Sequence, residues 1–156
     1  MKLKARELTV EAFAPYGSFV LASECLKDTG EPIAYVPEQL NVALCGSDAA
    51  IGVCRVAPQQ KVMGSMESHA HTEEGWILIN GAGVAAFGRP GADADAAQYE
   101  AFLIPQGTIL SLKTGVWHFG PFPVNGEALY AYAILPPGTP ENDLIMSELK
   151  ESIEIE

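Results

Sequence analysis

Glycine and proline interrupt this chain so often that short strands are favoured over long helices. The 156 residues include 15 Gly and 11 Pro, and the apolar runs between them are short. Short apolar runs bounded by turn-forming residues are typical of β-strands. Such runs occur at 51–56, 75–80, 84–87, 98–104, 108–112 and 128–135. We therefore expect a single all-β domain over residues 1–156, either a sandwich or a jelly-roll barrel.

Helices are expected only near the two ends of the chain. Thr9 can cap a short helix that ends at Phe13 or Ala14, because a hydroxyl at this position accepts a hydrogen bond from the first helical turn. The segment 141–153 predicts a terminal helix.

Turn residues divide the rest of the chain. Segment 18–22 is expected as a strand, and 24–41 as a loop with an extended piece at 33–36. Asn80-Gly81 is the strongest hairpin-turn dipeptide of the chain. It predicts that the strands on its two sides pair with each other.

The charge balance limits the possible partners. Lys and Arg number 9 against 20 Asp and Glu, which gives a formal net charge of -11. Such a surface repels nucleic acids and anionic membranes, so neither is expected as a partner. A small anionic substrate stays possible if a local positive centre, such as a metal ion, binds it.

The cysteines and the first residues indicate a cytoplasmic protein. Cys25, Cys45 and Cys54 show no Cys-x-x-Cys spacing, and we expect buried, reduced thiols. The first seven residues contain no apolar segment typical of a signal peptide. No apolar run approaches the ~18 residues of a membrane span.

The three histidines of the chain could share one site. His69 and His71 are two residues apart, and on a strand they would face the same side. Two imidazoles beside a carboxylate form a partial site for a divalent metal ion. His118 lies far along the chain and is the third candidate ligand.

Three carboxylates lie close to the first two histidines in the sequence. On an unbroken strand Glu73 would face the same side as His69, whereas a turn after His71 would bring Glu74 there instead. Glu67 shares the face of His69 and could accept a hydrogen bond from an imidazole, or it could be a solvent-exposed charge.

Candidates for substrate binding are the scarce cations and some aromatic residues. Arg55 or Lys113 could bind a substrate carboxylate, with Arg offering bidentate geometry. Trp76 is a candidate pocket wall or a core residue. Tyr130 and Tyr132 share one face of the run 128–135 and could line a cavity or simply pack.

Two motifs resemble those of the cupin superfamily. The first is Gly64-x4-His69-x-His71-x2-Glu74-x6-Gly81, with slightly short gaps. The second is a stretched version of the other cupin motif and runs from Pro105-x-Gly107 through His118 to Asn125. This resemblance implies a double-stranded β-helix, which is a jelly-roll barrel with its metal ligands inside the barrel mouth.

Among cupins, the chain is similar to the ureidoglycolate lyase family in three pieces. These are Leu8-Thr9-x-Glu11-Ala12-Phe13-Ala14-Pro15-Tyr16-Gly17, Met66-Glu67-x-His69-x-x-Thr72-x-Glu74, and Gly115-Val116-Trp117-His118 followed by Pro121. The chain departs from the family at Ala70, where Pro is common, and in the additional His71.

The resemblance implies cleavage of ureidoglycolate to glyoxylate and urea in purine (allantoin) breakdown, by a homodimer. A divalent ion (Ni, Zn, Mn or Fe) would bind to ligands among His69, His71, Glu74 and His118. The register of the family favours Glu74 over Glu73. Glu74 or Glu67 would act as the general base where it is not a ligand, and His118 would complete the catalytic site. The alternatives are a non-catalytic cupin that binds a metal or small molecule, and a cupin isomerase or dioxygenase-like enzyme.

Overall fold

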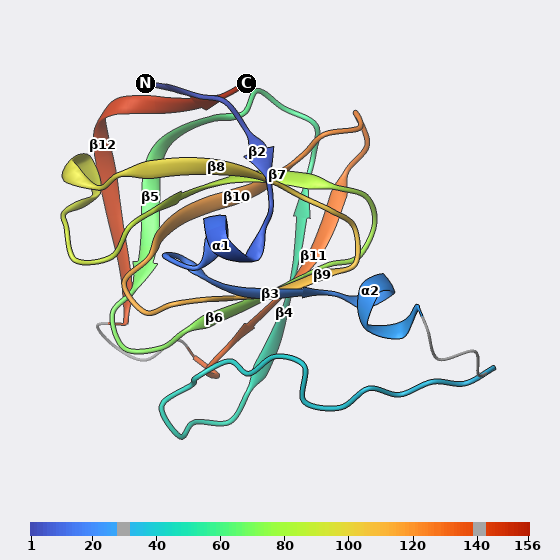
Figure 1. Ribbon diagram of the computed structural model, residues 1–156. Helices are drawn as coiled ribbons and strands as arrows, with labels where there is room; N and C mark the ends of the chain where they lie inside the picture. The colour runs from blue at the N-terminus through green and yellow to red at the C-terminus, as the bar shows by residue number, and fades with distance from the viewer. Residues whose placement is uncertain (28–31, 139–142) are drawn as a thin grey trace.

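Two β-sheets curl around a common interior in the computed structural model, which describes residues 1–27, 32–138 and 143–156 (Figure 1). In this part of the chain the larger sheet has seven strands, in the order β1 (Lys2–Leu3), β12 (Leu144–Ile155), β5 (Val62–His69), β10 (Trp117–Pro123), β7 (Gly83–Gly88), β8 (Tyr99–Ile104) and β2 (Arg6–Glu7). The smaller sheet has five, in the order β3 (Gly17–Leu21), β9 (Thr108–Leu112), β6 (Glu74–Leu78), β11 (Leu129–Leu135) and β4 (Ala50–Val56). The predicted all-β jelly-roll class is confirmed.

The helices in the described residues are short. They are α1 (Val10–Phe13), α2 (Ala22–Leu26) and the 3-10 turn η1 (Ala94–Ala96). The Thr9 hydroxyl accepts a hydrogen bond from the backbone N–H of Ala12 at 3.2 Å, which confirms the predicted N-terminal helix and its cap. α2 occupies the start of the segment expected as a loop, and the expected extended piece at 33–36 forms no strand. Residues 28–31 of that loop lie outside the described residues.

Aromatic side chains fill the interior next to α1, which lies between the two sheets (Figure 1). Phe13 is fully buried, and its ring meets the rings of Phe87 and Phe102 edge to face, at centroid distances of 5.2 and 5.6 Å. Such edge-to-face pairs add to the free energy of apolar burial. Trp76 extends this cluster, since its ring lies 5.9 Å from that of Phe87. The apolar cluster thereby supports the strand that begins at Glu74.

The predicted terminal helix at 141–153 is wrong. Residues 141 and 142 lie outside the described part, and Leu144–Ile155 form β12, which pairs antiparallel with β5. Pairing with β5 satisfies the backbone N–H and C=O groups of the segment, and it buries Ile153 and Ile155. Tertiary pairing here overrides the local helical preference, as is common for strands.

The predicted hairpin at Asn80-Gly81 is also wrong, although the turn itself forms with Gly81 at a φ of 86°. β6 belongs to the smaller sheet and pairs with β9 and β11, whereas β7 belongs to the larger sheet and pairs with β8 and β10. The chain therefore crosses from one sheet to the other at this turn. Consecutive strands of a jelly roll need not be neighbours, because they can lie in opposite sheets.

The cysteines differ from expectation in their exposure. All three are free thiols, but Cys45 and Cys54 are exposed and Cys25 is only partly buried. Cys54 is exposed because β4 is the edge strand of the smaller sheet. Within the described residues, no helix combines the length and apolar character needed to cross a bilayer.

The close approach of β3 to β9 yields a first prediction. A Cβ at Gly17 would lie 1.9 Å from the carbonyl oxygen of Ser111 on the neighbouring strand. Gly17→Ala should lower the free energy of unfolding by roughly 2–3 kcal/mol, because the strands would have to separate. Gly64→Ala on β5 is the matched control, since nothing lies within 4 Å of its added methyl group. Equal urea midpoints for the two variants would contradict the packing described.

Candidate functional site

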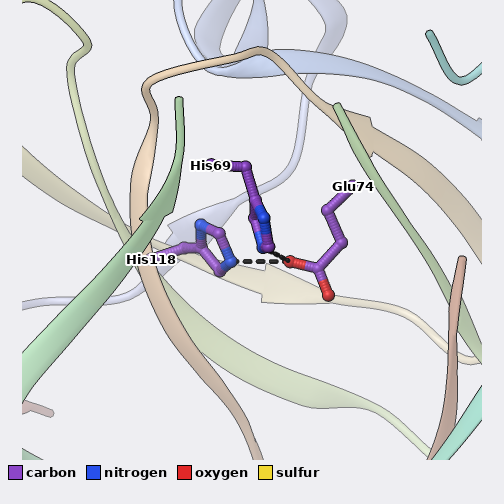
Figure 2. A group of neighbouring side chains, drawn as sticks. All are labelled: His69, Glu74 and His118. Carbon is purple, nitrogen blue, oxygen red and sulfur yellow. Dashed lines mark hydrogen bonds and ion pairs between the residues drawn. The ribbon is translucent and has the colours of Figure 1, made fainter. Parts of the chain in front are cut away.

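Two histidines and one glutamate meet between the sheets. His69 is the last residue of β5 and His118 the second residue of β10, both in the larger sheet, whereas Glu74 is the first residue of β6 in the smaller one. Figure 2 shows the three side chains pointing toward one another. Their candidate ligand atoms all lie within 4.8 Å of each other, and all three residues are buried.

The imidazole Nε2 atoms of both histidines approach the same carboxylate oxygen. His118 Nε2 lies 2.7 Å from Glu74 Oε2, and His69 Nε2 lies 3.5 Å from it (Figure 2). The two rings are stacked, with centroids 5.8 Å apart and an interplanar angle of 22°. The three donor atoms thus converge on one small volume.

Acceptors behind the imidazoles fix the orientation of both rings. His118 Nδ1 lies 2.9 Å from the carbonyl oxygen of Val116, and His69 Nδ1 lies 3.1 Å from Asp143 Oδ2. A carbonyl or carboxylate oxygen only accepts, so each Nδ1 carries a proton and donates it. The Nε2 atoms are therefore the ones directed at Glu74, in the arrangement that metal-binding histidines adopt.

Asp143 is a site residue that sequence reasoning missed. It is fully buried and accepts hydrogen bonds from the Thr72 hydroxyl at 2.8 Å, from the Thr72 backbone N–H at 3.1 Å and from the His71 backbone N–H at 2.7 Å. Asp143 thus ties the start of β12 to the turn that connects His69 with Glu74. No signal in the sequence pairs Asp143 with residues some seventy positions earlier. The expected helix at 141–153 also gave no reason to place Asp143 beside His69 and Thr72.

Burial and charge act against each other on the ionisable groups of the site. Burial raises the pKa of Glu74, but hydrogen bonds with His118 and His69 outweigh it and lower the pKa to about 2. Burial lowers the pKa of His118, but hydrogen bonds and charge interactions with Glu67 and Glu74 raise it to about 10. The pKa of His69 is raised on balance by Glu74 and Asp143, against the opposing effect of burial. Without a metal ion, Glu74 and His118 therefore form a buried ion pair.

The turn at 70–73 decides which of the candidate residues join this group. β5 ends at His69, so strand alternation does not extend to His71, whose side chain is exposed. Glu73 points elsewhere, and its Oε2 accepts hydrogen bonds from the Ala43 N–H and the Ser111 hydroxyl, both at 2.9 Å. The structure thus brings Glu74 to His69 and His118, and leaves His71 and Glu73 outside the group.

A cavity of about 200 Å³ opens beside Glu74. It is lined by Cys54, Glu67, Glu74, Trp76, Gly120, Pro121, Ala131, Tyr132 and Ala133. The side chain of Glu74 is 6% exposed and that of Glu67 is 31% exposed, so Glu74 lies deeper. Glu67 Oε1 lies 3.5 Å from His118 Nε2, which places this carboxylate beside the group as well.

The structure brings only some of the predicted substrate-binding residues to this cavity. Trp76 lines it and contacts His118 edge to face, at a centroid distance of 5.5 Å. Tyr132 contributes to the lining, although it is 38% exposed. Arg55 instead donates a hydrogen bond to the Tyr130 hydroxyl at 3.2 Å, and Lys113 donates to the Ala14 carbonyl oxygen at 2.5 Å. Arg55, Lys113 and Tyr130 are not part of the lining.

The donor set fits a metal ion. Two imidazole Nε2 atoms and one carboxylate can face a common point, and each imidazole is oriented by an acceptor behind it. Two histidines and a carboxylate are ligands used by catalytic zinc and non-haem iron sites. His69, Glu74 and His118 could therefore hold a metal ion.

Comparison with protein-family models and with curated proteins finds no match to this chain. The site is therefore characterised by its own geometry: a buried donor set, oriented from behind, at the side of a small cavity.

The hydrogen bonds of Asp143 lead to a stability prediction. Asp143→Ala should lower the free energy of unfolding by at least about 2 kcal/mol, because His69 and Thr72 would be left as buried donors without an acceptor. Thr72→Val removes only the hydroxyl donor and should cost about 1 kcal/mol. Urea unfolding of both variants measures the difference. An Asp143→Ala variant as stable as the parent protein would contradict the proposed role of Asp143.

The buried ion pair predicts how the stability of the metal-free protein depends on pH. The pKa of Glu74 falls from 4.5 to about 2 on folding. Its contribution to the free energy of unfolding is therefore complete above pH 4.5 and is lost as the pH falls toward 2. The pKa of His118 rises from 6.5 to about 10 on folding. Its contribution to the free energy of unfolding is therefore complete below pH 6.5 and is lost as the pH rises toward 10. Both contributions are complete only between those limits.

Thermal unfolding of the metal-free protein should therefore show a maximum of stability between pH 4.5 and 6.5. Glu74→Gln should remove the contribution of Glu74 to the loss of stability on the acidic side, and it should reduce the loss on the alkaline side only in part, because Glu67 still interacts with His118. A variant profile parallel to that of the parent protein would argue against the ion pair.

Proposed function

We propose that this protein is a metal-dependent carbon–nitrogen lyase of the cupin type, which cleaves ureidoglycolate to glyoxylate and urea. The observation that carries the proposal is the buried group of His69, Glu74 and His118 beside a cavity of small-molecule size. The two histidines come from the two separate sequence pieces that resemble the ureidoglycolate lyase family, and the fold brings them together. A homodimer is part of this proposal, and the exposed Ile51 and Val53 on β4 offer apolar surface for it.

His69, Glu74 and His118 would hold the metal ion, which we take to be Ni, Zn, Mn or Fe(II). When bound, the ion would supply a Lewis acid and a positive charge for the oxygens of a hydroxy acid. This charge matters because neither Lys nor Arg is among the residues that line the cavity. It would explain how so acidic a protein accepts an anionic substrate.

Because Glu74 would bind the metal ion, Glu67 is the cavity carboxylate that could transfer a proton. It lines the cavity, lies beside His118 and is more exposed than Glu74. In the proposed reaction the substrate hydroxyl loses its proton to Glu67, the carbonyl of glyoxylate forms, and the bond to the urea nitrogen breaks. The same proton then passes from Glu67 to that nitrogen, so the products are neutral urea and the glyoxylate anion. Trp76 and Pro121 contribute apolar walls to the cavity.

A non-catalytic protein that binds a metal or a small molecule is the second candidate. The direct pairing of His118 and Glu74 at 2.7 Å favours it, because this contact gives both buried groups a partner within the protein. A metal ion bound there would replace this contact.

Formation of urea and glyoxylate tests the proposal. Purified protein loaded in turn with each of the four metals should release both products from ureidoglycolate. His69→Ala and His118→Ala should lose bound metal and activity together. Glu67→Gln should keep the metal and lose activity by about 10²- to 10⁴-fold, as expected for removal of a general base. His71→Ala is the matched control and should keep both, because its side chain is exposed and lies outside the group.

Stoichiometric metal binding without urea formation would favour the binding protein. Full activity of His118→Ala would contradict the site itself.

A further inference from the structure

His69 and His118 are held in orientation by different kinds of contact. His118 Nδ1 donates to the carbonyl oxygen of Val116, two residues earlier in the chain, at 2.9 Å. His69 Nδ1 donates to Asp143 Oδ2 at 3.1 Å, and Asp143 lies 74 residues away in the sequence. The orientation of His118 is therefore fixed within its own segment, whereas that of His69 depends on a contact between distant parts of the chain.

The carboxylate of Asp143 accepts four hydrogen bonds. Its Oδ1 accepts from the backbone N–H groups of His71 and Thr72, at 2.7 and 3.1 Å. Its Oδ2 accepts from the Thr72 hydroxyl at 2.8 Å as well as from His69. These four donors use the four lone-pair positions of a carboxylate, and Asp143 is fully buried. A side chain that itself carried a donor could not satisfy all four.

The end of β12 that follows Asp143 buries little apolar surface. Its first three side chains are exposed, namely Leu144, Ile145 and Met146. In the part of the chain that the structure describes, β1 pairs only with the last residues of β12, so residues 144–148 pair with β5 alone. Little apolar burial is typical of segments that open locally. The hydrogen bonds of Asp143 are therefore important for docking this end of β12 onto the turn at 70–72.

We propose that Asp143 is a positioning residue, which makes His69 a metal ligand only while this end of β12 is docked on the turn at 70–72. The inference rests on the metal site of the proposed function, but not on the lyase reaction. Docked Asp143 keeps a proton on His69 Nδ1 and leaves Nε2 directed at Glu74. Undocking releases the ring of His69 and the turn that leads to Glu74. Metal binding and docking of β12 therefore stabilise each other, by the same factor in both directions.

Asp143→Asn is the sharpest variant, because the two side chains are equal in size but an amide also donates. If its NH₂ group faced the backbone N–H groups of His71 and Thr72, donors would oppose donors. If it faced His69, it would donate to Nδ1, and the neutral imidazole would carry its proton on Nε2, where a metal ion has to bind. The affinity for Zn²⁺, measured by competition with a chromophoric chelator, should fall by about 10- to 100-fold.

Thr72→Val is the matched control, because it removes one donor to the same carboxylate and leaves the contact with His69 in place. It should leave the affinity for Zn²⁺ nearly unchanged. Nitrogen-15 NMR of His69 adds a signature that a loss of stability alone would not produce. With Zn²⁺ present, the ring proton should be on Nδ1 in the parent protein and on Nε2 in Asp143→Asn. Equal affinities of these two proteins for Zn²⁺ would overturn the inference.

Hydrogen exchange of the unmodified protein gives a measurement that does not require any variant to fold. The amide protons of residues 144–148 report the docking of this end of β12, and none of the proposed metal ligands lies in that strand. Saturating Zn²⁺ should slow their exchange by about 5- to 150-fold, the range typical of coupling between two sites. The Ile155 amide, which donates to the Lys61 carbonyl oxygen at the far end of β12, is the internal control and should change far less. Equal slowing at both ends of β12 would indicate general stabilisation and would contradict the coupling.

The outcomes for this inference and for the proposed function are distinguishable. Coupling of Zn²⁺ to β12 without urea formation would refute the lyase proposal alone. An active lyase whose Zn²⁺ affinity is insensitive to Asp143→Asn would refute this inference alone. A parent protein that does not bind Zn²⁺ would overturn the inference together with the donor set on which it depends.

Discussion

The buried carboxylate of Glu74 is the charge that the surrounding structure has to stabilise. A carboxylate removed from water is costly unless it is paired and hydrogen-bonded. Here His118 and His69 supply the pairing, and Asp143 and the Val116 carbonyl orient the two imidazoles from behind. Because Glu74 belongs to the smaller sheet and both histidines to the larger one, this polar group also joins the two sheets.

The same arrangement places two glutamates in different surroundings. Glu74 is deeply buried and held by imidazoles, which suits a ligand for a metal ion. Glu67 lies nearer to solvent in the lining of the cavity, which suits a group that contacts the ligand. Glu74 on β6 would thus hold the proposed metal, and Glu67 on β5 of the other sheet would contact the proposed substrate.

Much of the fold could be predicted from local patterns. The cap at Thr9, the strand at 128–135 and the turn at Gly81 follow from short-range chemistry, and the structure contains each of them. The errors concern pairing partners. The segment 144–155 is a strand because β5 lies beside it, and the turn at Asn80-Gly81 connects two sheets because the jelly roll separates β6 from β7. Neither neighbour is visible in a local window of sequence.

For the site, the sequence by itself determined the chemistry available: three histidines, several carboxylates near two of them, and few cations. Only the tertiary structure decided which of these groups meet. The end of β5 at His69 sends His71 outward, and the turn that follows brings Glu74 inward. Asp143 joins from the residue just before β12, and Arg55 is directed away. The physical reason is that strand alternation predicts facing only while a strand continues, whereas contacts between distant strands depend on how the sheets pair and close.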